Sequence, residues 1–192
     1  MTAVPQPPEH LLTVAEYSEL GETEPGYTEL VEGRLQLSPC PAPDHNFASG
    51  ELFVQLRAQV PEHLEVIQDV DINLELAPAH SPGFSRRPDM VVTRAGARRR
   101  VRQAGGLLRA SEIVLVIEIV SPSSHRTDYI TKRGEYADAG IPHYWIIDIG
   151  APVSMLACHL TGEFGYADSG KHASVFATTD PFDFRLNLET LI

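Results

Sequence analysis

The chain has 192 residues, of which 43% are hydrophobic, and a formal net charge of −11 at pH 7, which argues against a protein that coats nucleic acid. This length and apolar content suit one folded domain over 1–192, with a loose, proline-rich tail over 1–10. No apolar run could cross a bilayer and no signal peptide is visible, so we expect a cytoplasmic protein without membrane contact.

Hydrophobic periodicity and turn residues predict the elements. Thr13 and Glu16 form a capping-box pattern, Asp44 can cap a second helix, and Gly140 can end a later one. In chain order we expect a helix over 13–20, a hairpin over 27–37 around Gly33, a helix over 44–60, strands over 64–76, 88–93 and 113–120, a helix over 127–139, a strand over 143–149, a hairpin over 153–166 and a short strand within 181–192. This order indicates an α/β fold with a mixed β-sheet flanked by helices.

A basic segment interrupts this acidic chain. Residues 94–109 hold six arginines and no acidic residue. One interpretation is a solvated loop. The other is an arm that contacts phosphate groups through Arg98, Arg99 and Arg100, because guanidinium groups suit bidentate phosphate contacts.

The strand Ile113–Val120 is apolar except for Glu118. A carboxylate in an apolar core needs a partner or stays protonated. Asp89 begins the preceding strand, and Lys132 lies in the helix that follows. Two carboxylates and a lysine suit metal-dependent phosphodiester hydrolysis, in which Mg²⁺ (or Mn²⁺ in its place) activates a water and the lysine stabilises developing charge. The alternative is that Asp89 is a strand-start acid and Lys132 part of a surface ion pair.

Six segments carry a family resemblance: YTELVEG at 27–33, SPCPAPDH at 38–45, PDM at 88–90, EIVSPSS at 118–124, DYITK at 128–132 and AGIPHYWIID at 139–148. In this order they resemble the PD-(D/E)XK nuclease superfamily and, within it, the bacterial Uma-two family of restriction endonucleases. The resemblance runs from about residue 10 to 170. It implies a restriction-endonuclease-like fold and a Mg²⁺-dependent endonuclease that acts on DNA.

One position departs from the superfamily pattern. The usual lysine stands two residues after the glutamate, where this chain has Val120. The family resemblance implies that Lys132 replaces it from the following helix. Asp128, four residues earlier on the same helix face, could orient Lys132.

The resemblance also places the YTELVEG segment at the edge of the active site. Glu29 and Glu32 are therefore both candidates for a third acid. Strand alternation does not choose between them. We prefer Glu32, beside the Gly33 turn, and the alternative is that both are exposed hairpin acids.

Three further residues are candidates for supporting roles. His45 could contact phosphate or transfer a proton, Asp71 could support the site from the strand over 64–76, and Tyr136 could line the pocket. The leading function is a Mg²⁺-dependent endodeoxyribonuclease in which Asp89 and Glu118 bind metal and Glu32 and Lys132 complete the catalytic set. The alternative is a catalytically silent nuclease fold that binds nucleic acid or acts as a regulatory scaffold. Cutting both strands of a duplex would favour a homodimer.

Overall fold

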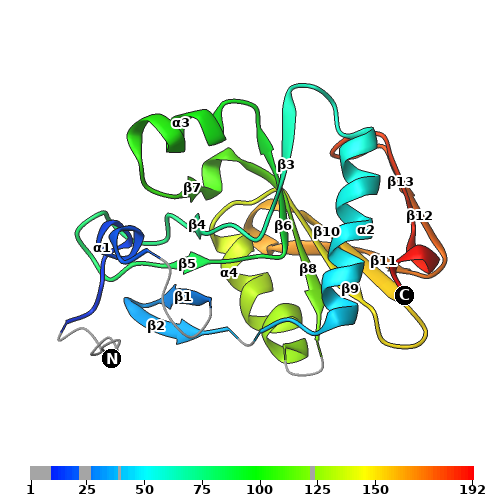
Figure 1. Cartoon of the computed structure of the whole chain (residues 1–192), viewed down its shortest axis with the longest axis horizontal. Coiled ribbons are helices and arrows are strands. Elements are labelled where there is room, and N and C mark those ends of the chain that lie inside the picture. The colour runs from blue at the N-terminus through cyan, green and yellow to red at the C-terminus, as the bar shows by residue number, and fades with distance from the viewer. Residues whose placement is uncertain (1–9, 22–26, 39, 122–123) are drawn as a thin grey trace.

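The structure is a computed structural model that describes residues 10–21, 27–38, 40–121 and 124–192. Nearly all of the expected N-terminal tail lies outside the described residues, as do positions 122–123 of the SPSS segment. The expected α/β class is confirmed, with mixed sheets flanked by helices (Figure 1). Within the described ranges, no helix is long and apolar enough to cross a membrane.

The main sheet has six strands in the order β11-β10-β9-β8-β6-β3. Its central strands β8 and β9 run parallel, and every other neighbouring pair in it is antiparallel. A parallel pair buried on both faces explains the nearly continuous apolar run of β8. The strands span β3 (Leu64–Gln68), β6 (Met90–Arg94), β8 (Ile113–Val120), β9 (His143–Asp148), β10 (Ser154–Leu160) and β11 (Tyr166–His172).

Helices cover both faces of β8. Leu115 and Ile117 belong to the core that includes α2 (Pro43–Gln59), whereas Val116 packs with the core around α4 (Arg133–Asp138). Successive side chains of a strand point to opposite faces, so Glu118 shares the α4 face with Val116. A π-helical turn, Thr127–Lys132, links β8 to α4.

A second sheet has five short strands in the order β2-β1-β5-β4-β7. This sheet places the hairpin of β1 and β2 close to the part of β8 that carries Glu118, as the side-chain contacts described below show. Its strands are β1 (Thr28–Val31), β2 (Arg34–Leu37), β4 (Ile72–Asn73), β5 (Ser85–Arg86) and β7 (Leu108–Arg109). The other elements are α1 (Val14–Glu19), α3 (Ala97–Ala104), the pair β12 (Val175–Thr178) and β13 (Phe184–Asn187), and three 3₁₀ turns at Ala110–Glu112, Gly162–Phe164 and Leu188–Leu191.

Several predicted elements are confirmed. The capping box at Thr13 forms, with the Thr13 hydroxyl accepting from the Glu16 N–H at 3.2 Å. The hairpin turns at Glu32 and Gly33, whose φ angles of 50° and 75° fit a two-residue turn with both residues in the left-handed region. The second helix starts slightly earlier than expected, with Pro43 in its first turn and Ala42 rather than Asp44 as its N-cap.

Three predictions were wrong in detail. The single strand expected over 64–76 is two strands in different sheets, divided at Asp69, where φ is 51°. The arginine segment is not a loop, because α3 forms within it between Gly96 and Gly105, both at positive φ. The helix expected over 127–139 begins with a π-helical turn instead of regular α-helix.

Candidate active site

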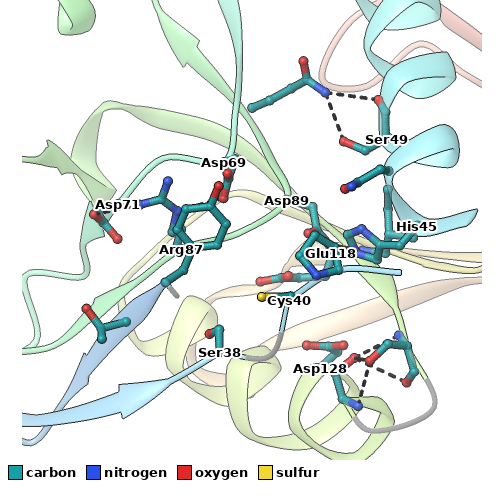
Figure 2. Close-up of a pocket in the computed structure, with 18 of the residues that line it drawn as sticks. Ser38, Cys40, His45, Ser49, Asp69, Asp71, Arg87, Asp89, Glu118 and Asp128 are labelled. Atoms are coloured by element: carbon teal, nitrogen blue, oxygen red, sulfur yellow. Dashed lines mark hydrogen bonds and ion pairs between the residues drawn. The ribbon is translucent and has the colours of Figure 1, made fainter. Parts of the chain in front are cut away.

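A cavity of about 1180 Å³ opens between the hairpin, the first turns of α2, the end of β8 and the π-helical turn (Figure 2). Five of the predicted site residues line one part of it: His45, Asp89, Glu118, Asp128 and Lys132. They come from four separate stretches of the chain. The fold therefore brings three of the four predicted catalytic residues, Asp89, Glu118 and Lys132, to one place.

Asp89 lies just before β6, beside β8. Its Oδ2 accepts a hydrogen bond of 2.6 Å from the backbone N–H of Ile119, which fixes the carboxylate next to Glu118. Its Oδ1 lies 3.2 Å from Nε2 of His45 in the first turn of α2. The hydrogen bond to Asp89 is the main cause of a raised pKa for His45, so this histidine holds a proton more firmly than a free one.

Glu118 is 3% exposed and has two partners. Its Oε1 accepts hydrogen bonds from Lys132 Nζ at 2.9 Å and from the Tyr136 hydroxyl at 2.7 Å. Burial raises the pKa of Glu118 to about 8, and the negative charges of Asp89 and Asp128 add to the effect while Lys132 opposes it. The buried Glu118 carboxylate thus has hydrogen-bonding partners, as its position in an apolar strand required.

Lys132 reaches back from the end of the π-helical turn. Its Nζ lies 2.9 Å from Glu118 Oε1, 3.5 Å from Asp128 Oδ1 and 3.6 Å from Glu29 Oε1. Burial acts to lower the pKa of Lys132, but the three carboxylates outweigh it and raise that pKa above its usual value. Lys132 is therefore a permanent cation. A π turn at a functional site is a recurrent observation in proteins.

The geometry favours Glu29 over Glu32 as the third acid of the site, whereas from the sequence we preferred Glu32. Glu32 is exposed at the hairpin turn, where its φ angle is 50°. Glu29 is 5% exposed and lies close to Lys132. Alternation failed here because β1 is covered on both faces, so that Glu29 and Leu30 are both buried.

Sequence reasoning missed Arg86, which is 2% exposed. Its Nη1 donates to Glu29 Oε2 at 2.7 Å, while Nε and Nη2 hold both oxygens of Glu135 at 2.6 and 2.7 Å. Burial acts to raise the pKa of Glu29, but Lys132 and Arg86 together lower it. The signal was the string RRPD, in which Arg86 and Arg87 stand directly before Pro88 and Asp89.

Other predicted residues lie away from this cluster. Asp71 lines the cavity, but it contacts Tyr17 and Arg87. The arginines of α3 are not among the lining residues. Arg98 pairs with Glu65 at 3.0 Å, Arg100 pairs with Glu112 at 2.6 Å, and Arg99 is exposed.

A magnesium ion fits the donor chemistry of the site. Among the residues that the structure describes, no three His, Cys, Asp or Glu side chains converge as a preformed metal cage. Mg²⁺, however, usually keeps several waters and needs only one or two carboxylates from the protein. Asp89 and Glu118 are hard oxygen ligands, and Asp89, just before β6, is fixed to the backbone N–H of Ile119, the residue after Glu118 in the neighbouring strand β8. These two residues would therefore hold the ion.

The mixed α/β fold, with two carboxylates at β6 and β8 and a lysine from the following π-helical turn, is that of a nuclease-like domain. The model of the Uma2 family (Uma-two above), described as "Putative restriction endonuclease", matches residues 14–168, so the chain belongs to this family. A crystal structure of "a putative nuclease belonging to DUF820" from Anabaena variabilis ATCC 29413 is similar, with a TM-score of 0.70 and 19% identity over 94% of this chain and 97% of that chain. That likeness shows a shared fold. No curated protein matches the chain.

Proposed function

We propose that the chain is a metal-dependent endonuclease that hydrolyses phosphodiester bonds in DNA. One observation carries the proposal. Lys132 comes from the π-helical turn after β8 and lies 2.9 Å from Glu118, and the next residue of β8, Ile119, donates to the Asp89 carboxylate. This arrangement supplies the cation that Val120, at the superfamily's usual lysine position, does not.

The roles follow from the contacts. Asp89 and Glu118 would hold Mg²⁺ or Mn²⁺, which when bound neutralises charge on the scissile phosphate and lowers the pKa of a water. Lys132 orients the attacking water and stabilises the charge that develops on the phosphate. Glu29 positions Lys132 from the hairpin side. His45, which lines the cavity 3.2 Å from Asp89 Oδ1, would give a proton to the leaving oxygen.

Cleavage of supercoiled plasmid tests this function. The purified protein should nick or cut plasmid with Mg²⁺ or Mn²⁺ and should leave it intact with EDTA. Glu118→Ala should abolish both cleavage and the binding of Mn²⁺ measured by calorimetry. Undiminished cleavage by Glu118→Ala would show that another site does the chemistry.

The second candidate is a catalytically silent nuclease fold that serves as a binding or regulatory scaffold. The observation that favours it is that Lys132 and Tyr136 already satisfy Glu118 Oε1 without any metal. Calorimetry separates the two candidates, because a scaffold of this kind would bind neither Mg²⁺ nor Mn²⁺.

If the substrate is duplex DNA, two copies of the chain would be needed to cut both strands with one site each. We therefore infer a homodimer for that reaction. Light scattering of the protein alone and with a short DNA duplex measures the oligomeric state directly. A monomer in both conditions that still makes double-strand breaks would contradict the dimer.

A further inference from the structure

The end of the cavity away from Glu118 has its own set of residues, which the proposed chemistry does not use. Tyr17, Tyr27, Asp69, Asp71 and Arg87 line it. Figure 2 shows Asp69, Asp71 and Arg87 grouped on one side of the cavity and Asp89, Glu118 and His45 on the other. We propose that this end binds an unpaired nucleobase beside the scissile phosphate. The inference rests on the proposed nuclease function and makes the substrate single-stranded or locally unpaired DNA.

A flat stacking surface is the first feature that suits a base. The guanidinium carbon of Arg87 lies 4.0 Å from the centre of the Tyr27 ring, and Tyr27 is 39% exposed. Aromatic rings and guanidinium planes are the surfaces on which proteins stack unpaired bases. Stacking on such a platform tolerates any base, since every base has a π face.

The charges at this end select a base rather than a phosphate. Arg87 Nε is held by Asp69 Oδ1 at 2.8 Å, and Arg87 Nη1 lies 3.5 Å from Asp71 Oδ2. The arginine charge is thus balanced by two carboxylates, which repel a phosphate. Carboxylate oxygens accept hydrogen bonds from the exocyclic amino groups of adenine, cytosine and guanine. Asp71 is further fixed by the Tyr17 hydroxyl, 3.3 Å from its Oδ1.

The burial of the proposed catalytic residues also favours an unpaired strand as substrate. Glu118 is 3% exposed and Lys132 is 8% exposed, so the reacting phosphate must enter the cavity to reach them. In an intact duplex the bases are paired and stacked, so none is free to reach Tyr27 while its phosphate lies at Glu118. A strand whose bases are splayed apart can enter, with one base going to Tyr27.

The backbone connects the two ends of the cavity. Asp69 adopts a left-handed φ of 51°, a conformation that a non-glycine residue keeps only where its surroundings hold it. Its N–H donates to the carbonyl of Asp89 at 3.1 Å. The turn that carries Asp69 is therefore tied to the residue that would bind metal. This tie sets a fixed spacing between a bound base and the phosphate that is cut.

A fluorescent base tests the subsite without relying on cleavage. The probe is a single-stranded DNA oligonucleotide with one 2-aminopurine, whose emission falls when the base stacks on an aromatic ring. The wild-type protein, with Ca²⁺ in place of Mg²⁺, should bind the probe and quench it, and the fully paired duplex should bind at least tenfold more weakly. Tyr27→Leu should weaken binding of the single strand about tenfold and remove the quenching.

Phe164→Leu is the matched control, because it removes a 92% exposed aromatic ring that does not line the cavity. It should bind and quench as the wild type does. Equal affinity and quenching in Tyr27→Leu would overturn the subsite, as would a preference for the intact duplex or no binding of the probe at all. Quenching that depends on Tyr27 in a protein that never cuts DNA would support the subsite and overturn the nuclease function instead.

Discussion

Lys132 Nζ lies 2.9 Å from Glu118 Oε1, although the lysine belongs to the π-helical turn and the glutamate to the strand before it. The strand keeps Val120 where a lysine would usually stand, and Val120 packs in the α4-side core. The cation thus reaches the carboxylate from the helix side, and the strand stays apolar. In the proposed mechanism the two groups therefore have separate functions, with the acids binding metal and the lysine stabilising charge.

The first prediction tests that separation. Lys132→Met should lower plasmid cleavage roughly 100- to 1000-fold, the usual cost of removing a group that stabilises developing charge. It should still bind Mn²⁺, because Asp89 and Glu118 remain. Asp89→Asn should lose both cleavage and Mn²⁺ binding. Cleavage rates and calorimetry on the same preparations check this, and a Lys132→Met protein with normal cleavage would contradict the assigned role.

The second prediction compares the two glutamates of one hairpin. Glu29→Gln should reduce cleavage about tenfold, because it removes a carboxylate that lies 3.6 Å from Lys132 Nζ and helps to hold it. Glu32→Gln, at the exposed turn, should cleave at the wild-type rate. Both variants keep the hairpin and its turn glycine. The reverse order of effects would restore Glu32 as the third acid.

The third prediction concerns the buried arginine. Arg86→Met leaves Glu29 and Glu135 without their shared partner, and breaking a buried ion pair from one side costs about 3–5 kcal/mol. Arg98→Met breaks a pair with Glu65 in which the arginine side chain is 63% exposed, and it should cost less than about 0.5 kcal/mol. Urea unfolding followed by circular dichroism measures both. Equal losses would mean that the Arg86 cluster is not a buried charge network.

The fourth prediction is a pH dependence without metal. Burial raises the pKa of Glu118 from 4.5 to about 8, so between these values the folded protein binds more protons than the unfolded chain. Folding stability should therefore fall as pH rises through this window, by up to about 1.4 kcal/mol per pH unit from this one group. Glu118→Gln has no such proton to lose. The stability of the wild type relative to this variant should thus decline from pH 5 to pH 8 in EDTA.

The sequence predicted which residues meet at the centre of the candidate site and missed those around them, for a physical reason. Glu118 stands out because a charge in an apolar strand demands a partner, and Asp89 and Lys132 follow from neighbouring elements. Choosing Glu29 over Glu32 requires knowing that Arg86 in β5, the strand beside β1, and Lys132 lie against Glu29, and both contacts are long-range. The role of Arg86 was missed for the same reason, since the RRPD string places it near Asp89 but its partners Glu29 and Glu135 are distant in the chain.

Secondary-structure prediction from the local sequence also failed where tertiary contacts determine the structure. The alternating stretch over 64–76 reads as one strand, yet the left-handed Asp69 divides it and sends its halves to different sheets. In the arginine segment the helix signals were present, namely the good helix formers Arg and Ala between Gly96 and Gly105. The high density of arginines nevertheless led us to predict a loop, because the acidic partners Glu65 and Glu112 lie outside the segment.

The fifth prediction asks whether α3 contacts DNA, and the structure sharpens which arginines to change. Arg98 and Arg99 are exposed, whereas Arg100 is held by both oxygens of Glu112 and also donates to the carbonyl of Leu107. If the helix contacts the backbone of single-stranded DNA, changing Arg98 and Arg99 to Gln should weaken binding. The slope of log K against log salt should then become shallower by about 1.4, or 0.7 for each lost phosphate contact.

Arg100→Gln is the informative comparison for this prediction. It should lower the free energy of unfolding, because the ion pair with Glu112 is lost. The salt slope of DNA binding should stay as in the wild type, because the Arg100 guanidinium is bound to Glu112 and does not contact phosphate. Fluorescence anisotropy at several salt concentrations, paired with urea unfolding, separates the two effects. An unchanged salt slope in the double variant of Arg98 and Arg99 would make α3 a solvated surface, and DNA would then be held by the cavity alone.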